Sequence, residues 1–326
     1  MRKKIRVAVV SGGKSAEHEV SLRSAKNVAA AMDKSKYEVV PVKIGKTGQW
    51  PIRGSWEKFF SSIDVVFPIL HGPFGEDGTV QGLLKIIGVP FVGAGVLGSA
   101  VGMDKDVMKR LLRQASIPVG KFMVFKSGEK ISFVRVRRGL GLPLFVKPAN
   151  MGSSVGVSKA VDELSLAKAI KTAFKFDTKI IIEEFIAGRE LECAVLGNDE
   201  PIVSVPGEVL VKGGFYSYEA KYSSASEAVT EIPAKVPQKI VKEIQKLAVK
   251  TFTTLCGEGL ARVDFFLKND GRIYVNEINT MPGFTNISMY PKLWAESGIS
   301  YSHLIDRLIQ LALAHTKAEK KLRISI

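Results

Sequence analysis

The chain has 326 residues, of which 46% are hydrophobic, so it is long and apolar enough to form more than one core. Its two cysteines exclude a disulfide framework, and no apolar stretch reaches the roughly 18 residues that a membrane-spanning helix needs. The formal net charge of +15 is spread along the sequence without a zinc-finger or groove-reading pattern, which favours a solvated surface. We therefore expect a cytoplasmic globular protein with no nucleic-acid or membrane partner.

Residues 1–103 alternate strand-like and helical segments. β-Branched or apolar runs are separated by stretches of helical spacing such as 20–32. The expected strands are 5–10, 39–44, 64–70 and 89–92. This alternation predicts an α/β unit with a mostly parallel sheet, which binds ligands beyond the carboxyl ends of its strands. The segments 11–17 and 71–78 follow such ends and are candidate functional loops.

Two further units of α+β type are expected, at 104–182 and 183–326. The first carries a glycine-serine loop, and the second carries a loop rich in Tyr, Ser and Gly at about 208–226. In chain order, the expected elements are a helix at 106–115, strands at 144–146 and 155–157, a helix at 161–174, a strand at 179–182, a long helix at 237–255, a hairpin around 270 and a helix at 302–314.

Two glycine-containing motifs are typical of nucleotide-binding folds, but neither fits its context. Gly13-Lys14-Ser15 lacks the first glycine of a P-loop, because position 8 is Ala8. Residues 93–98 match GxGxxG, yet no strand that ends in an acidic residue follows at the expected distance. We interpret 93–98 as a tight strand-to-helix turn, and a nicotinamide-dependent oxidoreductase is the alternative.

The strongest local signal is the segment 259–283, in which two alternating strands flank Asp270-Gly271. This pair is favoured in two-residue type I′ turns. The cross-strand pairs expected with that turn are Asp264 with Glu277 and Arg262 with Asn279. Their side chains share one face, because the side-chain period of a strand is two.

Two carboxylates that face each other across a strand pair repel, so we expect a cation between them. Asp264, Glu277 and Asn279 offer oxygen ligands, which suit Mg²⁺, an ion that shares its shell with substrate phosphates. A surface hairpin whose carboxylates pair with lysines explains these residues equally well. Arg262 and the turn at 282–283 favour the metal site, because they add a cation and backbone N–H donors.

A second candidate phosphate site combines a lysine with a flexible loop. Lys147 ends one strand, and the glycine-serine segment 152–156 leads towards the next. Such a loop can fold over a polyphosphate with N–H and hydroxyl donors. Taken alone the signal has low specificity, because glycine-serine hairpins are common.

Together these features resemble the ATP-grasp superfamily, and more narrowly the D-alanine:D-alanine ligase family. The resemblance extends from residue 7 to about 311. It rests on ordered matches at 15–21, 70–72, 75–78, 103–105, 152–156, 218–222 and 277–283. It implies an ATP-grasp fold preceded by a Rossmann-like parallel-sheet domain.

The resemblance also implies an activity. Members of the family use ATP to phosphorylate one D-alanine, and the amine of a second D-alanine attacks the acyl phosphate to give D-alanyl-D-alanine for peptidoglycan. ATP is then a co-substrate, two Mg²⁺ ions are expected with Mn²⁺ as a substitute, and a homodimer through the first unit is expected. The alternative within the fold is a D-alanine:D-lactate ligase, against which Tyr222 argues.

For the amino-acid substrates, the resemblance assigns roles to side chains from all three units. Glu17 is expected to bind the ammonium of the first D-alanine, although its position also suits a carboxylate at a helix N-terminus. His71 is expected near that substrate, and a capping or packing histidine explains it equally well. The other residues expected here are Ser153 and Tyr222 beside Glu17, Arg262 and the N–H of Gly283 at the oxyanion, and Lys221, Ser288 and Met289 at the second D-alanine.

For the nucleotide and metal, the resemblance assigns a second set. The expected contacts are Lys105, Lys147, Ser153, Ser154 and Lys221 to the phosphates, Glu183, Glu184, Phe185 and Ile186 to adenine, Glu190 to ribose, and Asp264, Glu277 and Asn279 to Mg²⁺. The loop at 208–226 is expected to act as a lid, with hinge freedom from Gly213 and Gly214, since acyl phosphates hydrolyse unless water is excluded.

Overall fold

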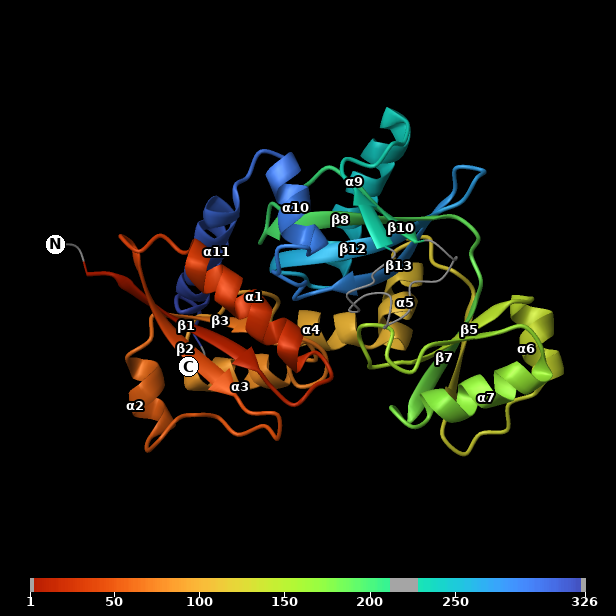
Figure 1. Cartoon of the computed structure of the whole chain (residues 1–326), viewed down its shortest axis with the longest axis horizontal. Coiled ribbons are helices and arrows are strands. Elements are labelled where there is room, and N and C mark those ends of the chain that lie inside the picture. Colours follow the sequence, from red (N-terminus) through yellow and green to blue (C-terminus); the bar gives the residue numbers. More distant parts are fainter. Residues whose placement is uncertain (1–2, 212–227, 324–326) are drawn as a thin grey trace.

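The computed structural model describes residues 3–211 and 228–323, which form three β-sheets (Figure 1). The N-terminal sheet and a four-stranded sheet lie towards opposite ends of the molecule, and a six-stranded sheet lies between and above them in this view. No helix in the described ranges combines the length and apolar character needed to cross a membrane.

The N-terminal sheet is parallel throughout, with strand order β2-β1-β3. Its elements are β1 (Ile5–Gly12), α1 (His18–Ala31), β2 (Tyr37–Ile44), α2 (Trp56–Ser61), β3 (Val65–Ile69), α3 (Thr79–Ile87) and α4 (Val96–Met103). All residues of β3 are buried, as expected for a parallel strand that is covered on both faces. The expected α/β character of this region is confirmed.

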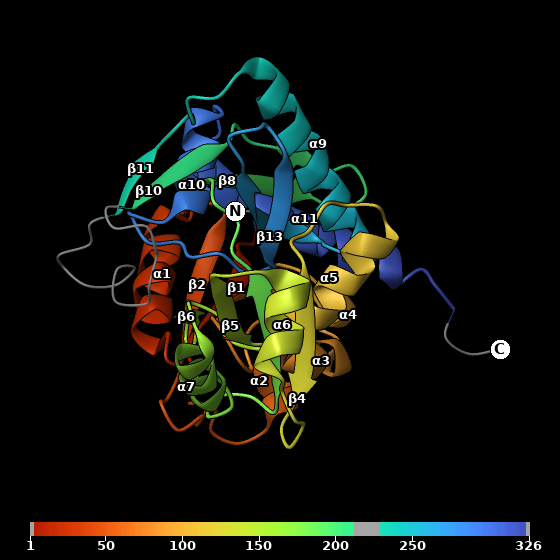
Figure 2. The ribbon, with the colours of Figure 1, turned by 90° about the vertical axis from the view of Figure 1, so that its right-hand side faces the viewer.

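The four-stranded sheet is antiparallel, with order β4-β7-β5-β6. Its elements are β4 (Phe122–Lys126), α6 (Phe133–Leu140), β5 (Leu144–Pro148), β6 (Ser158–Ala160), α7 (Glu163–Ala173) and β7 (Lys179–Glu184). Figure 2 views the molecule from this end and shows α6 and α7 nearest the viewer.

The six-stranded sheet has the order β11-β10-β8-β12-β13, and β9 pairs with β8. Its strands are β8 (Arg189–Gly197), β9 (Ile202–Val203), β10 (Gly207–Val211), β11 (Ala228–Glu231), β12 (Gly259–Leu267) and β13 (Ile273–Asn279). The remaining helices are α5 (Lys105–Gln114), α9 (Gln238–Thr254), α10 (Met289–Glu296) and α11 (Tyr301–Glu319).

One hydrophobic core joins the two ends of the sequence. Val9 and Phe67 of the N-terminal sheet are buried in the same cluster as Phe284, Trp294 and Leu308 near the C-terminus. Helix α5 packs in a second cluster with β12 and β13, whereas the four-stranded sheet has a cluster of its own. The division of the chain at residues 103 and 182 stays a prediction.

Two expected strands differ in the structure. The strand expected at 89–92 is wrong: it is reduced to an isolated bridge between Phe91 and Val66, and the positive φ of Gly93 (106°) turns the chain away. The strand expected at 155–157 starts three residues later, at Ser158. Positive φ values at Ser153 and Ser154 (49° and 61°) are incompatible with strand geometry, so they keep the glycine-serine loop irregular.

The hairpin has the predicted pairs but a different turn. Asp264 pairs with Glu277, and Arg262 with Asn279, as expected. The turn is longer by one residue, because Lys268 bonds to Arg272 on both sides of a three-residue loop. A β-bulge next to Asp264 restores the register on the far side. The extra loop residue and the bulge therefore compensate for each other, and the predicted pairs of Arg262 and Asp264 are kept.

The GxGxxG segment is a packing turn, as predicted. Gly95 is the N-cap of α4, and a Cβ at Gly98 would lie 2.2 Å from the backbone oxygen of Cys256. Glycine is therefore required at position 98 by the close approach of α4 to a neighbouring turn.

Candidate active site

One cavity lies between the four-stranded and six-stranded sheets and has an empty volume of ≈ 950 Å³. Its walls contain every nucleotide contact that the family resemblance implies within the described residues. Those residues are Lys105, Lys147, Ser153, Ser154, Glu183, Glu184, Phe185, Ile186 and Glu190. Phe145, Asn276 and Glu277 also line this cavity, which we call the nucleotide cavity.

Two lysines bring positive charge to the nucleotide cavity. Lys105 begins α5 and donates a hydrogen bond of 2.7 Å to the backbone oxygen of Met151, while its Nζ lies 3.8 Å from Oε2 of Glu277. Burial lowers the pKa of Lys105. Burial also acts against the charge of Lys147, but the carboxylates of Glu183 and Glu277 outweigh it and raise the pKa of Lys147.

Glu183 is buried between two lysines. Its carboxylate lies 2.8 Å from Nζ of Lys109 on α5 and 2.6 Å from Nζ of Lys147 on β5. Burial favours its neutral form, but the two lysines prevail and lower the pKa of Glu183 to about 2. Both lysines therefore already occupy the carboxylate of Glu183 in the wall of the nucleotide cavity.

A second cavity, with an empty volume of ≈ 970 Å³, lies beside the first. We call it the substrate cavity. Ser153 and Glu277 line both cavities. The expected substrate residues that line it are Glu17, His71, Ser153, Arg262, Gly283, Ser288 and Met289. Lys221, Tyr222, Gly213, Gly214 and most of the loop expected to act as a lid lie outside the described residues.

The loop that follows β1 contacts the glycine-serine loop through Glu17 and Ser153. Oγ of Ser153 donates a hydrogen bond to Oε1 of Glu17. Glu17 is also the N-cap residue of α1, but its side chain makes no capping hydrogen bond. The expected position at a helix N-terminus is therefore confirmed, and the same carboxylate accepts the hydrogen bond from the glycine-serine loop.

His71 lies two residues after the end of β3 and is buried, and its two ring nitrogens have different surroundings. Its Nδ1 lies 3.0 Å from the backbone oxygen of Met281 and 3.3 Å from Oε1 of Glu76. Both are acceptors, so Nδ1 carries a proton. Burial lowers the pKa of His71, but the hydrogen bond and charge of Glu76 outweigh it and raise the pKa. Its Nε2 is buried and has no hydrogen-bond partner among the described residues, which leaves it available to a substrate.

Arg262 is held by two carboxylates. Its guanidinium forms two hydrogen bonds of 2.7 Å with Asp264, and its Nε lies 2.9 Å from Oε2 of Glu192. Burial disfavours the cation, but Asp264 and Glu192 reverse the effect and raise the pKa of Arg262. Arg262 is thus a fixed positive charge in the wall of the substrate cavity.

Carboxylates form a row across three strands of the six-stranded sheet. Glu192 on β8 pairs with Asp264 on β12, which pairs with Glu277 on β13. Asn279 donates a hydrogen bond of 3.1 Å from Nδ2 to Asp264, so its amide adjoins the row. Oxygen donors of this kind fit Mg²⁺. The described residues contain no group of three or more His, Cys, Asp or Glu able to hold a metal, so a site here needs the Asn279 oxygen or ligands from the substrate.

Gly283 and Ser288 lie against each other in the wall of the substrate cavity. A Cβ at position 283 would lie 2.8 Å from Oγ of Ser288. Oγ of Ser288 accepts a hydrogen bond of 2.9 Å from the N–H of Thr285. Met289 begins α10 and is buried. The absence of a side chain at Gly283 leaves its backbone accessible beside this serine.

Sequence reasoning missed two acidic residues of the site. Glu192 binds Arg262, and Glu76 binds His71. Glu192 follows Glu190 at the strand period of two, and that spacing was a usable signal that both line one face. Nothing in the sequence indicates the fold-dependent contact between Glu76 and His71.

The chain matches known families along most of its length. Models described as D-ala D-ala ligase N-terminus and C-terminus match residues 6–60 and 51–94, and residues 111–310, respectively. A D-alanine–D-alanine ligase from Oceanobacillus iheyensis is 48% identical over 364 aligned positions, which cover 100% of this chain and 99% of that protein.

Solved structures agree with these matches. The D-alanine–D-alanine ligase from Coxiella burnetii has a TM-score of 0.87 at 35% identity, covering 98% of this chain and 96% of its own. The Bacillus anthracis D-alanine–D-alanine ligase, solved in complex with ATP, has a TM-score of 0.82 at 31% identity, covering 97% and 99%. The expected ATP-grasp fold is confirmed, and the oxidoreductase alternative is excluded. The chain belongs to the D-alanine–D-alanine ligase family.

Proposed function

We propose that this chain uses ATP to join two D-alanine molecules into D-alanyl-D-alanine, a precursor of peptidoglycan, with release of ADP and phosphate. The observation that carries the proposal is the meeting of the two cavities at Ser153 and Glu277. A phosphate bound between the lysines of one cavity then adjoins the carboxylate of a substrate held in the other.

The first step is phosphoryl transfer to D-alanine. Lys105 and Lys147 hold the nucleotide phosphates, and the N–H and hydroxyl groups of the loop at 152–156 cover them. A carboxylate oxygen of the first D-alanine forms a bond to the γ-phosphorus, and the bond from that phosphorus to ADP breaks. The carboxylate is thereby activated, because phosphate is a better leaving group than oxide.

Mg²⁺ is the metal that fits the chain. Asp264, Glu277 and Asn279 would hold it, with two ions expected and Mn²⁺ as a substitute. When bound, the metal neutralises charge on the phosphate oxygens. The support from this structure is the row of carboxylates in one sheet, with Lys105 next to its Glu277 end.

The second step is attack by an amine. Glu17, supported by Ser153 and Tyr222, holds the ammonium of the first D-alanine, with His71 beside it. Ser288 and Lys221 hold the carboxylate of the second D-alanine, beside Met289. Its amine bonds to the activated carbonyl carbon, and Arg262 and the N–H of Gly283 hold the oxyanion. Phosphate then leaves, and the nitrogen loses a proton.

Relatives named as D-alanine–D-alanine ligases favour an amine acceptor over D-lactate. A homodimer through the first unit, the three units divided at residues 103 and 182, and a cytoplasmic location remain proposals that rest on the family resemblance.

ADP release in MgCl₂ tests the function, with the product identified by mass spectrometry. We expect ADP and D-alanyl-D-alanine from ATP and D-alanine, and no dipeptide from L-alanine. An ester product from D-alanine mixed with D-lactate, in place of the dipeptide, would support the alternative ligase. ADP release that is independent of D-alanine would contradict both.

A further inference from the structure

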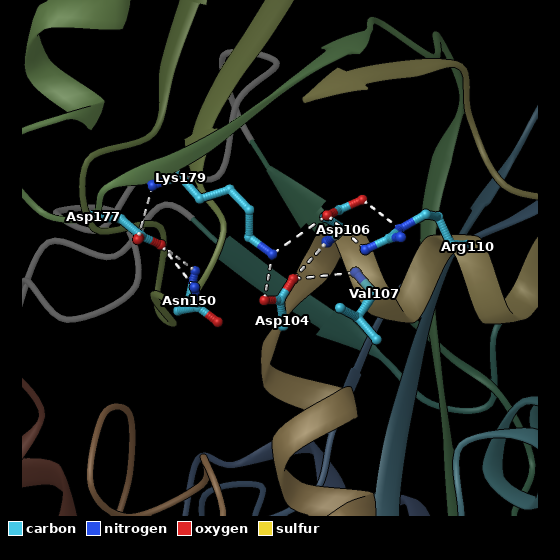
Figure 3. A network of polar contacts seen from close by, with 7 residues as sticks. All are labelled: Asp104, Asp106, Val107, Arg110, Asn150, Asp177 and Lys179. Atoms are coloured by element: carbon cyan, nitrogen blue, oxygen red, sulfur yellow. Dashed lines mark hydrogen bonds and ion pairs between the residues drawn. The ribbon is translucent and has the colours of Figure 1, made fainter. Parts of the chain in front are cut away.

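Lys179, the first residue of β7, lies at the centre of a polar network (Figure 3). Its residues are not among those that line the nucleotide cavity or the substrate cavity. Nζ of Lys179 lies 2.5 Å from Oδ2 of Asp104 and 3.3 Å from Oδ2 of Asp106. Asp104 is the N-cap of α5, and its Oδ1 accepts hydrogen bonds of 3.1 Å from the N–H groups of Asp106 and Val107. One carboxylate thus caps the helix and binds Lys179.

The backbone of Lys179 forms hydrogen bonds that connect it to the segment 149–150, directly and through Asp177. Oδ1 of Asp177 accepts a hydrogen bond of 3.0 Å from the N–H of Lys179. Oδ2 of Asp177 accepts two hydrogen bonds from Asn150, of 2.8 Å from its backbone N–H and of 3.0 Å from its Nδ2. The N–H of Ala149 donates to the backbone oxygen of Lys179, and the N–H of Lys105 donates to that of Ala149. The start of α5 and the segment before the glycine-serine loop therefore meet at one residue.

This meeting point joins two separately packed parts of the chain. Helix α5 is buried with β12 and β13, whereas β7 and β5 belong to the core of the four-stranded sheet. The side chains of Lys179, Asp104 and Asp106 are exposed by only 18%, 18% and 11%. Charges in this setting are held together strongly, because separating them leaves a poorly solvated ion.

The sequence neighbours of the network are phosphate contacts. Lys105 directly follows Asp104, and the loop at 152–156 begins two residues after Asn150. Nζ of Lys105 donates a hydrogen bond to the backbone oxygen of Met151, so the side chain of Lys105 directly contacts the residue before the glycine-serine loop. Among the described residues that line the nucleotide cavity, none is Lys179, Asp104, Asp106, Asn150 or Asp177. The network residues therefore lie next to the phosphate contacts in the sequence but do not themselves line the nucleotide cavity.

We propose that Lys179 is a positioning residue for nucleotide binding, which it serves by fixing Lys105 relative to the glycine-serine loop through Asp104 and Asp106. The inference rests on the nucleotide site of the proposed function, but not on the identity of the amino-acid substrate. Loss of the lysine charge frees α5 to move against β7 and separates the two halves of the phosphate site.

Lys179→Met keeps the length of the side chain and removes its charge. We expect KM for ATP and Kd for ADP in MgCl₂ to rise about tenfold, which corresponds to ~1.4 kcal/mol, with KM for D-alanine within about twofold. Lys179→Arg restores a cation, so its KM for ATP stays within about threefold of the unsubstituted chain. Arg110→Gln is the matched control, because Arg110 binds only the Asp106 end of the network and is 64% exposed.

Asp104→Asn separates positioning from folding. Asparagine caps a helix as well as aspartate does, so α5 keeps its start while the ion pair with Lys179 is lost. We expect Kd for ADP to rise, though by no more than in Lys179→Met, and the double variant to match Lys179→Met, because the ion pair that Asp104→Asn removes is one of the two that Lys179→Met removes. If Lys179→Met fails to fold, the Kd for ADP of Asp104→Asn alone tests whether the ion pair positions the nucleotide site.

Unchanged ADP affinity in both variants, equal rises in KM for ATP and D-alanine, or effects that multiply in the double variant would overturn the proposal. Calorimetric titration with ADP needs no D-alanine. A chain that binds ADP but forms no dipeptide would therefore refute the proposed function and leave this inference to be decided by the affinities.

Discussion

At the scale of single residues, each buried lysine or arginine around the two cavities lies beside a carboxylate. Lys105 lies near Glu277, Lys147 and Lys109 share Glu183, and Arg262 binds two carboxylates. Burying an ion costs several kcal/mol unless an opposite charge compensates. The cations are therefore fixed by the carboxylates of the protein, which is the preorganisation that the proposed roles of Lys105, Lys147 and Arg262 require.

The pKa of Glu183 predicts a pH dependence of stability. Its folded-state pKa of about 2 is below the ordinary value of 4.5, so its contribution is present above pH 4.5 and is lost as the pH falls towards 2. We expect the free energy of unfolding to fall about 2 kcal/mol more between pH 7 and pH 3 than in Glu183→Gln. Urea unfolding at both pH values measures this.

Glu183→Gln should itself be less stable at pH 7, because two buried lysines lose their partner. Equal pH dependence in the two proteins would show that Glu183 is not held ionised by Lys109 and Lys147.

Glu277→Gln tests the metal assignment. We expect kcat to fall by about 100-fold or more, since a carboxylate that binds Mg²⁺ beside the reacting phosphate is lost, while the thermal midpoint changes little. The control is Glu38→Gln, an exposed carboxylate that pairs with Arg6 far from the cavities. A variant with nearly normal turnover would show that Glu277 does not hold the metal.

At the scale of elements, the hairpin shows what a sequence can and cannot predict. The pairs Asp264 with Glu277 and Arg262 with Asn279 were predicted from a two-residue turn, and both are present. The turn has one more residue, and a bulge compensates for it. Pattern and period predict which face a side chain occupies, but they do not indicate the extra residue on β13 between Val275 and Glu277 that forms the bulge.

The same limit explains the other differences. The strand expected at 89–92 has strand-like residues, but its pairing is confined to Phe91. The partner of Glu76 is five residues away, and the partner of Glu192 is seventy residues away. The family resemblance therefore named residues that line one cavity, whereas the carboxylates that support Arg262 and His71 became evident only from the fold.

Glycine 98 provides a test of packing at this scale. Gly98→Ala places a Cβ against the backbone oxygen of Cys256, so we expect a loss of about 1–3 kcal/mol in the free energy of unfolding. Gly82→Ala in α3 is the matched control, because no heavy atom lies within 4 Å of the added Cβ apart from the neighbouring residues and the helix's own backbone, and alanine should stabilise the helix by about 1 kcal/mol. Equal effects at both sites, measured by urea unfolding, would exclude the close approach as the reason for Gly98.

At the scale of the whole molecule, the site exists because three sheets converge. The three sheets are seen together in Figure 1. Glu17 and His71 lie in loops that follow β1 and β3 of the N-terminal sheet, Lys147 lies on β5 of the four-stranded sheet, and Arg262 and Glu277 lie on β12 and β13 of the six-stranded sheet. The core shared by β1, β3, α10 and α11 fixes two of these sheets against each other. The sequence predicted three α/β and α+β units, but their mutual placement follows from that shared core.

The route of oxygen during turnover shows whether ATP activates the carboxylate of D-alanine. D-Alanine labelled with ¹⁸O in its carboxylate is incubated with the chain, ATP and MgCl₂, and the released phosphate is analysed by mass spectrometry. We predict one ¹⁸O atom in each phosphate, because the carboxylate oxygen that bonds to the γ-phosphorus leaves with it. Unlabelled phosphate released together with dipeptide and ADP would contradict activation of the D-alanine carboxylate by ATP.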